Sequence, residues 1–208
     1  MLQELLERYP ALAACRASIE QAAACWIDCF ADGGKLLVCG NGGSCADSDH
    51  IVGELMKGFL KKRPLSAAQK QAMRERCPQL TEAELNSLQL GLPTVALPAL
   101  TALNTAFCND ADPTLLYAQG VMGLGRPGDV LVGISTSGNS ANVLAAAKTA
   151  KGLGLTVIGL TGQGGGRLAQ VADVCIRVPE TETFKVQELH LPVYHYLCAA
   201  TEAHFYAE

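Results

Sequence analysis

Five short runs of almost uninterrupted apolar residues most constrain what this chain can fold into. They are KLLVCG (35–40), TVALP (94–98), DVLVGIS (129–135), TVIGLTG (156–162) and VCIRV (174–178). Such runs are typical of strands buried on both faces, as in a parallel sheet with helices on either side. Helical patterns separate several of them, at 44–60, 113–124 and 141–153. We therefore expect an α/β fold, a three-layer αβα sandwich around a five-stranded parallel sheet.

Two further helical patterns, at 11–31 and 185–206, flank the sheet at both termini. The length of 208 residues suits one domain, so we treat 1–208 as a single unit. One segment differs from its surroundings: residues 65–91 are polar and rich in Gln and Glu. Thr81 and Glu84 have the spacing of a capping box, which predicts a short helix there. We interpret the segment as a helical excursion on the surface, either a solubilising or subunit-contacting flap or a substrate lid.

Composition excludes several classes of function. The 16 Lys and Arg against 20 Asp and Glu give a net charge of −4, which disfavours nucleic acid as a partner. No apolar run reaches the ~18 residues of a membrane span. The nine cysteines include no CxxC pair, so neither a thiolate metal cage nor a disulfide framework is indicated. Because the amino terminus also lacks the pattern of a signal peptide, we expect a cytoplasmic protein.

Three loops at predicted strand ends are rich in small and polar residues. The first is formed by Asn41, Gly42, Gly43 and Ser44, the second by Ser135, Thr136, Ser137 and Ser140, and the third contains Gly164–Gly166. Glycines let backbone N–H groups converge on an anion, and hydroxyls donate to phosphate oxygens. GxxxxGK[ST] is absent, and GxGxxG does not follow the first predicted strand, so we expect no nucleotide cofactor. The loops predict a phosphate held by neutral donors, with plain strand-to-helix turns as the alternative.

Four segments in order carry a family resemblance: GNGGS, DHIVGEL, ISTSGNSANV and QELHLPVYH. Together they resemble the SIS (sugar isomerase) domain family, and more closely its sedoheptulose 7-phosphate isomerases. The resemblance runs from about residue 15 to the carboxyl terminus, interrupted by 65–91. It implies the SIS fold, a homotetramer with active sites between subunits, and a role in heptose biosynthesis. The implied reaction converts sedoheptulose 7-phosphate to D-glycero-D-manno-heptose 7-phosphate through an enediol.

The resemblance also implies roles for individual residues. Glu54 and His195 would be the acid/base pair, and a zinc ion, at partial occupancy, would be held by His50, Glu54, Gln187 and His195. With Ser44 of the first loop, the expected phosphosugar-binding residues are Asn41, Gly42, Gly43, Asn109, Asp110, Ser135, Thr136, Ser137, Ser140 and Gln187.

Elementary chemistry agrees with part of this assignment. A ketose–aldose isomerisation needs a base and an acid near the carbonyl, which a carboxylate and an imidazole provide at neutral pH. His50 and Glu54, four residues apart, share one helix face. Gln187 and His195 are eight residues apart, about 12 Å along a straight helix, too far to reach one ion. Either Pro192 kinks the helix or the two residues serve different copies of the site; we favour the second.

Two alternatives stay open at this point. The chain could be a non-catalytic, phosphosugar-binding regulatory SIS protein, or an isomerase of a different phosphosugar. Gly58 stands where close relatives often have an arginine, so Lys57 or Lys61 would have to replace it. His190, outside the motif, is interpreted as a structural hydrogen-bonding residue rather than a catalyst.

Overall fold

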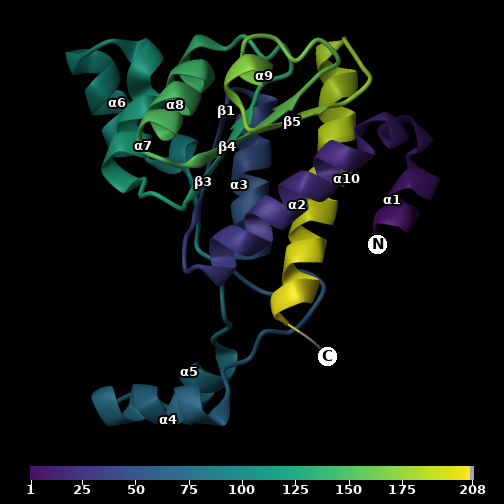
Figure 1. The fold of residues 1–208 in the computed structure, drawn as a ribbon. Helices are drawn as coiled ribbons and strands as arrows, with labels where there is room; N and C mark the ends of the chain where they lie inside the picture. Colours follow the sequence, from purple (N-terminus) through teal and green to yellow (C-terminus); the bar gives the residue numbers. More distant parts are fainter. Residues whose placement is uncertain (207–208) are drawn as a thin grey trace.

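The computed structural model describes residues 1–206 and contains a five-stranded, all-parallel sheet in the order β2-β1-β3-β4-β5 (Figure 1). The strands are β1 (Leu36–Gly40), β2 (Thr94–Ala96), β3 (Val130–Ile134), β4 (Thr156–Thr161) and β5 (Val174–Arg177). The central strands β1 and β3 pair in register from Leu36 with Val130 to Gly40 with Ile134. Each strand falls within one of the five predicted runs, so the prediction of the sheet is confirmed.

Helices cover both faces of the sheet. One layer holds α2 (Arg16–Ala31), α3 (Gly43–Leu55) and α10 (Thr183–Phe205), and the other holds α7 (Leu116–Leu124) and α8 (Ala141–Gly152). Alternate residues of β1 enter different cores: Leu36 and Val38 pack with Trp26, whereas Leu37 and Cys39 pack with the α7 and α8 side. This alternation is the period of two expected of a strand buried on both faces, and it confirms the three-layer sandwich.

The remaining elements are short or peripheral. They are α1 (Leu2–Arg8), η1 (Pro10–Cys15), η2 (Leu97–Ala99), α6 (Thr101–Asp110), η3 (Pro113–Leu115) and α9 (Leu168–Val171). The helix expected over 44–60 ends earlier, at Leu55. The Arg63 guanidinium donates to the carbonyl oxygens of Glu54 and Leu55, at 3.2 and 2.6 Å. These bonds satisfy carbonyl groups that the end of the helix leaves open.

The polar segment forms an arm that projects from the body of the molecule (Figure 1). Its two helices, α4 (Ala67–Arg76) and α5 (Glu82–Ser87), each begin with a capping box, from Ser66 and Thr81 respectively. The base of the arm is closed by a bridge between Pro64 and Gln89 and by the bond from Leu90 N to Arg63 O, 2.8 Å. The two ends of the arm therefore lie side by side.

A buried ion pair, which we call the clamp, joins this base to α10. Arg63 and Glu202 contact at 2.8 Å, and their side chains are 0% and 1% exposed. The Glu202 carboxylate also accepts hydrogen bonds from the backbone N–H groups of Phe59, Leu60 and Lys61, at 2.7–3.0 Å. The end of α3 is thereby fixed against the last turns of α10. No helix among residues 1–206 is long and apolar enough to cross a bilayer.

Candidate active site

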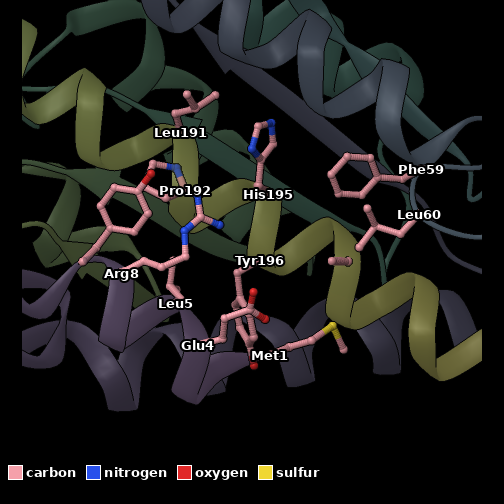
Figure 2. Close-up of a pocket in the computed structure, with 12 residues that line it drawn as sticks. Met1, Glu4, Leu5, Arg8, Phe59, Leu60, Leu191, Pro192, His195 and Tyr196 are labelled. Carbon is pink, nitrogen blue, oxygen red and sulfur yellow. The ribbon is translucent and has the colours of Figure 1, made fainter.

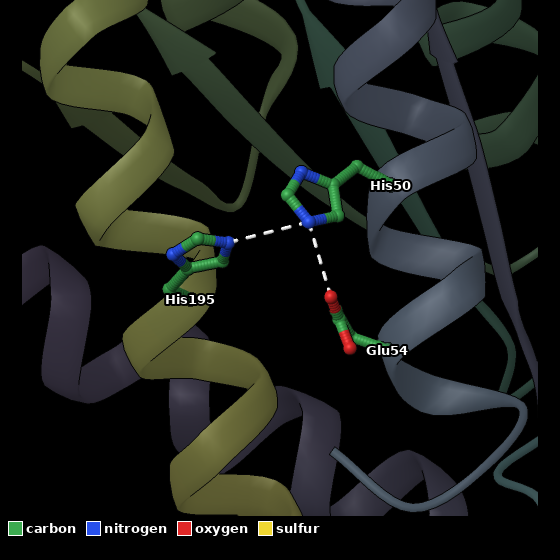
Figure 3. A group of neighbouring side chains, drawn as sticks. All are labelled: His50, Glu54 and His195. Atoms are coloured by element: carbon green, nitrogen blue, oxygen red, sulfur yellow. Dashed lines mark hydrogen bonds and ion pairs between the residues drawn. The ribbon is translucent and has the colours of Figure 1, made fainter. Parts of the chain in front are cut away.

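The predicted residues His50, Glu54 and His195 form one cluster between α3 and α10 (Figure 3). Because His50 and Glu54 lie one turn apart on α3, Nε2 of His50 reaches Oε1 of Glu54 at 3.0 Å. His195 comes from α10 and places its Nε2 3.4 Å from the same His50 nitrogen. The ligand atoms of all three residues lie within 4.8 Å of one another. Three groups with electron pairs thus converge on one point.

Gln187, by contrast, lies at the other end of α3. Its side chain packs against Gly43, where a Cβ would approach the Gln187 amide nitrogen to 2.5 Å. Helix α10 continues through Pro192, so eight residues separate Gln187 from His195 along one helix, about 12 Å. Within one chain, Gln187 is therefore placed with the first polar loop rather than with His50 and Glu54.

Burial and the neighbouring side chains set the electrostatics of the cluster. Burial lowers the pKa of His195, as does His50 beside it, while Glu54 opposes the shift. A neutral imidazole is therefore favoured at neutral pH, and a neutral imidazole can accept a proton or bind a metal. Lys57 places its Nζ 3.6 Å from Oε2 of Glu54. Of the two lysines considered as replacements for an arginine at position 58, Lys57 is the one that contacts the site.

A groove of about 330 Å³ opens beside His195, between α1 and α10 (Figure 2). Leu60 and Leu191 line it and are 66% and 40% exposed, and Phe59 stacks near His195 with ring centroids 5.6 Å apart. His195 therefore lines this groove as well as the cluster, while Glu54 is not among the residues that line the groove.

The first and second polar loops meet at the carboxyl ends of β1 and β3, as adjacent parallel strands require. Asn41 exchanges two hydrogen bonds with Asn142, each 2.9 Å, and the Tyr117 hydroxyl donates to Gly40 O at 2.8 Å. In the second loop, the hydroxyls of Ser135 and Ser140 lie 3.0 Å apart at the start of α8. Hydroxyls, amides and a helix N-terminus are thus gathered at one edge of the sheet.

The third loop supports the second through direct backbone contact. Gly138 has a φ of +66°, and a side chain there would overlap the carbonyl of Gly165. Leu168 N donates to Gly138 O at 2.9 Å, and Arg167 N donates to the Asn139 side chain at 3.1 Å. Only glycine allows this close approach in this conformation.

Asn109 and Asp110 lie at the end of α6, a helix that periodicity did not predict because none of its residues is buried. Among residues 1–206, their one side-chain hydrogen bond joins Asn109 Nδ2 to Asp110 Oδ1, at 2.8 Å. The structure of one chain does not bring them into contact with the serine loop.

Some residues at the site were not anticipated. Tyr194 contacts both His50 and Asp47. Tyr117 and Asn142 each donate a hydrogen bond to Asn41 of the first loop. Asp47 precedes His50 by three residues, so helical periodicity could have placed it on the same face. Nothing in the sequence pairs Tyr194 with α3.

The donor set fits a metal ion. Two imidazoles and a carboxylate are ligands that zinc accepts, and catalytic zinc sites commonly have three protein ligands. His50, Glu54 and His195 offer three such atoms within reach of one ion.

Comparisons with known proteins show what the chain as a whole is similar to. A family model described as the SIS domain matches residues 2–89 and 86–162. The phosphoheptose isomerase of Rhodospirillum rubrum is 43% identical over 188 residues, covering 90% of this chain and 86% of that protein. The one from Akkermansia muciniphila is 36% identical over 202 residues, covering 97% and 93%. Among solved structures, the phosphoheptose isomerase from Neisseria gonorrhoeae has a TM-score of 0.76 at 34% identity, covering 97% of this chain and 94% of that one.

Proposed function

Because this chain belongs to the phosphoheptose isomerase family of SIS-domain proteins, we propose that it converts sedoheptulose 7-phosphate to D-glycero-D-manno-heptose 7-phosphate. The observation that carries the proposal is the cluster of His50, Glu54 and His195 in a chain that also has hydroxyl-rich loops at its sheet edge. The cluster supplies proton-transfer groups, and the loops supply donors for a phosphate.

Glu54 and His195 share the proton transfers. One removes the proton from C1 of the ketose, and the other donates a proton to the carbonyl oxygen at C2, which gives an enediol. Return of a proton to C2 and loss of the proton from the C1 hydroxyl then give the aldose. The neutral state favoured for His195 and the 16% exposure of the Glu54 side chain suit both groups for proton exchange.

The phosphate is bound without a cationic side chain in the loops. Asn41, Gly42, Gly43 and Ser44 form one side of the site, and Ser135, Thr136, Ser137 and Ser140 form the other. The first N–H groups of α8 point toward the same edge, where a helix N-terminus favours an anion. Gln187, packed on Gly43, belongs to this end of the site. A sugar contact from Asn109 and Asp110 rests on the family resemblance, because within residues 1–206 they make no hydrogen bond to the serine loop.

His50, Glu54 and His195 would hold a zinc ion, which when bound would supply a positive charge that polarises the sugar oxygens. Gln187 completes the ligand set in another copy of the site, since it lies about 12 Å along α10 from His195. This arrangement places the sites between subunits, in keeping with the homotetramer that the family resemblance implies. The exposed Leu60 and Leu191 beside His195 provide apolar surface for such a contact. Nine unpaired cysteines suit a reducing cytoplasm.

The test is conversion of sedoheptulose 7-phosphate by the purified protein, followed by NMR with zinc added or chelated. We expect the aldoheptose phosphate to form, and Glu54→Gln and His195→Ala to lower kcat by about 10²–10⁴-fold. Glu188→Gln and His204→Ala, at exposed positions on α10, are the matched controls.

A folded wild type that does not convert the substrate would overturn the proposal. Binding of the phosphosugar without turnover would then favour a regulatory SIS protein, and turnover of another phosphosugar would favour an isomerase of different specificity.

A further inference from the structure

The clamp contacts the turn of α3 that carries Glu54. Glu54 is the last residue but one of this helix, which ends at Leu55. Carbonyl groups in the final turn of a helix lack partners within the helix, so the turn frays unless other groups bond to it. Arg63 Nη1 donates to Leu55 O at 2.6 Å, and Nη2 donates to Glu54 O at 3.2 Å. Leu92 N also donates to Leu55 O, at 2.9 Å, so the turn is held from outside the helix.

The position of the Glu54 carboxylate depends on this turn. Oε1 of Glu54 lies 3.0 Å from Nε2 of His50 because residues 50–54 keep helical spacing. Each residue that leaves a helix lengthens the backbone from about 1.5 Å to about 3.3 Å. Unwinding of the last turn would therefore carry the carboxylate out of reach of His50 and His195.

The other member of the clamp contacts a neighbour of His195. Oε1 of Glu202 accepts a hydrogen bond from Phe59 N at 2.8 Å, and the Phe59 ring packs near His195 with centroids 5.6 Å apart. Glu202 also lies on α10, seven residues after His195, which is about 10 Å along the helix. One buried ion pair is thus bonded both to the turn of Glu54 and to the residue that packs on His195.

We propose that Arg63 is a positioning residue of the active site, which holds the last turn of α3 and so keeps Glu54 within reach of His50 and His195. Each of its three side-chain nitrogens has a partner: Nε bonds to Glu202, and Nη1 and Nη2 bond to the two carbonyl oxygens. A lysine keeps the positive charge beside Glu202, but its single nitrogen cannot reproduce the three-way geometry. Arg63→Lys therefore separates the position of the turn from the balance of buried charge.

The first test is amide hydrogen exchange of the metal-free, full-length protein. In the wild type, we expect the N–H groups of residues 54–56 to be protected as strongly as those in the middle of α3. In Arg63→Lys, we expect residues 54–56 to exchange about tenfold faster or more, since bonds at the turn are lost, while the middle of α3 stays protected. Val157→Ala is the matched control, because Val157 is fully buried in the core on the α7 and α8 side of the sheet. It should lower Tm without changing the exchange of residues 54–56.

The effect on turnover rests on the proposed function, whereas the order of the turn does not. A misplacement of about 1 Å at a reacting group can cost about 10²-fold in rate, so we expect Arg63→Lys to lower kcat by about that factor. KM for sedoheptulose 7-phosphate should stay close to the wild-type value, because Arg63 does not contact the phosphate-binding loops. Val157→Ala should keep the wild-type kcat at temperatures where it is folded.

Wild-type residues 54–56 that exchange as fast as a frayed helix end would overturn the inference, as would unchanged exchange in Arg63→Lys. An equal loss of kcat in Val157→Ala would also overturn it, because lower stability alone would then explain the effect. If Arg63→Lys does not fold, the exchange of the wild type still decides, since the proposal requires protection there. A wild type that lacks isomerase activity but shows the expected exchange would refute the proposed function and leave the role of Arg63 in ordering the turn intact.

Discussion

Replacing Glu202 by glutamine is expected to destabilise the protein strongly, although Glu202 does not belong to the cluster. Oε2 of Glu202 accepts from the backbone N–H groups of Leu60 and Lys61, and Oε1 accepts from Phe59 N and Arg63 Nε. A glutamine replaces one of these oxygens by an NH₂ group, so two buried donors would face another donor. Each unsatisfied buried donor costs about 1–3 kcal/mol.

The charge of Arg63 would also lose its partner in a site without solvent. Breaking a buried ion pair by removing one member typically costs about 3–5 kcal/mol, which agrees with the cost of the two donors. For a chain of this length, such a loss lowers Tm by roughly 6–20 °C. Thermal unfolding followed by circular dichroism measures the change. Glu188→Gln, an exposed glutamate on α10, is the control and should shift stability by less than about 0.5 kcal/mol.

The pH dependence gives a second check on the clamp. Burial alone would raise the pKa of Glu202, but hydrogen bonds from Phe59, Leu60 and Arg63 outweigh it and hold the pKa below its ordinary value of 4.5. A carboxylate with a lowered pKa in the folded state stabilises the protein above the unfolded pKa. This contribution is lost as the pH falls through the folded pKa. The stability difference between wild type and Glu202→Gln should therefore be full at neutral pH and shrink below about pH 4.5.

A loss of less than about 1 kcal/mol in Glu202→Gln at neutral pH would refute this reasoning, because it would mean that the buried donors find other acceptors. Full recovery of wild-type stability in the double variant Arg63→Met/Glu202→Leu would also refute this reasoning. That double variant removes both charges but leaves the N–H groups of residues 59–61 without an acceptor, so we expect it to remain unstable.

Two further predictions concern other parts of the fold. Gly138→Ala should lower Tm and weaken phosphosugar binding, because a methyl at a φ of +66° would overlap the Gly165 carbonyl. Gly152→Ala, with open space around the added methyl, is the control. Equal Tm values for the two variants would contradict the argument. Burial lowers the pKa of His190 from 6.5 to about 4, so as the pH falls the unfolded chain binds a proton before the folded protein does. The free energy of unfolding should therefore fall by roughly 3 kcal/mol as the pH drops from 6.5 to 4. Urea unfolding over this pH range measures the slope, and an equal slope in His190→Leu would show that His190 does not cause it.

The parts of the fold that the sequence predicted share a local signal. The five strands are apolar runs, and His50 and Glu54 meet because four residues make about one helical turn. The helix over 44–60 was predicted too long, since its actual end depends on Arg63, which local periodicity does not reveal.

Contacts between distant segments lay outside what residue patterns can show. His195 reaches His50 only because α10 packs beside α3, and the family resemblance, not periodicity, paired them. Tyr194 was missed for the same reason. The interpretation of His190 as a hydrogen-bonding residue is not confirmed: it is fully buried, and within residues 1–206 neither ring nitrogen has a partner in hydrogen-bond geometry, although the Thr161 backbone near it partly offsets the lowering of its pKa by burial. A sequence shows that a histidine lies in an apolar helix but not what its ring will meet.

The closed base of the arm has a consequence for how this protein could change over evolution. Since residues 63 and 90 are joined by a hydrogen bond and residues 64 and 89 by a bridge, the body already holds the two ends of the arm together. Lengthening, shortening or exchanging the segment between them costs little loop-closure entropy, which grows only slowly with length. The strands and the cluster keep their contacts when the segment between residues 64 and 89 changes. Natural variation or a grafted domain can therefore add new surface at the arm without changing the packing of the rest of the molecule.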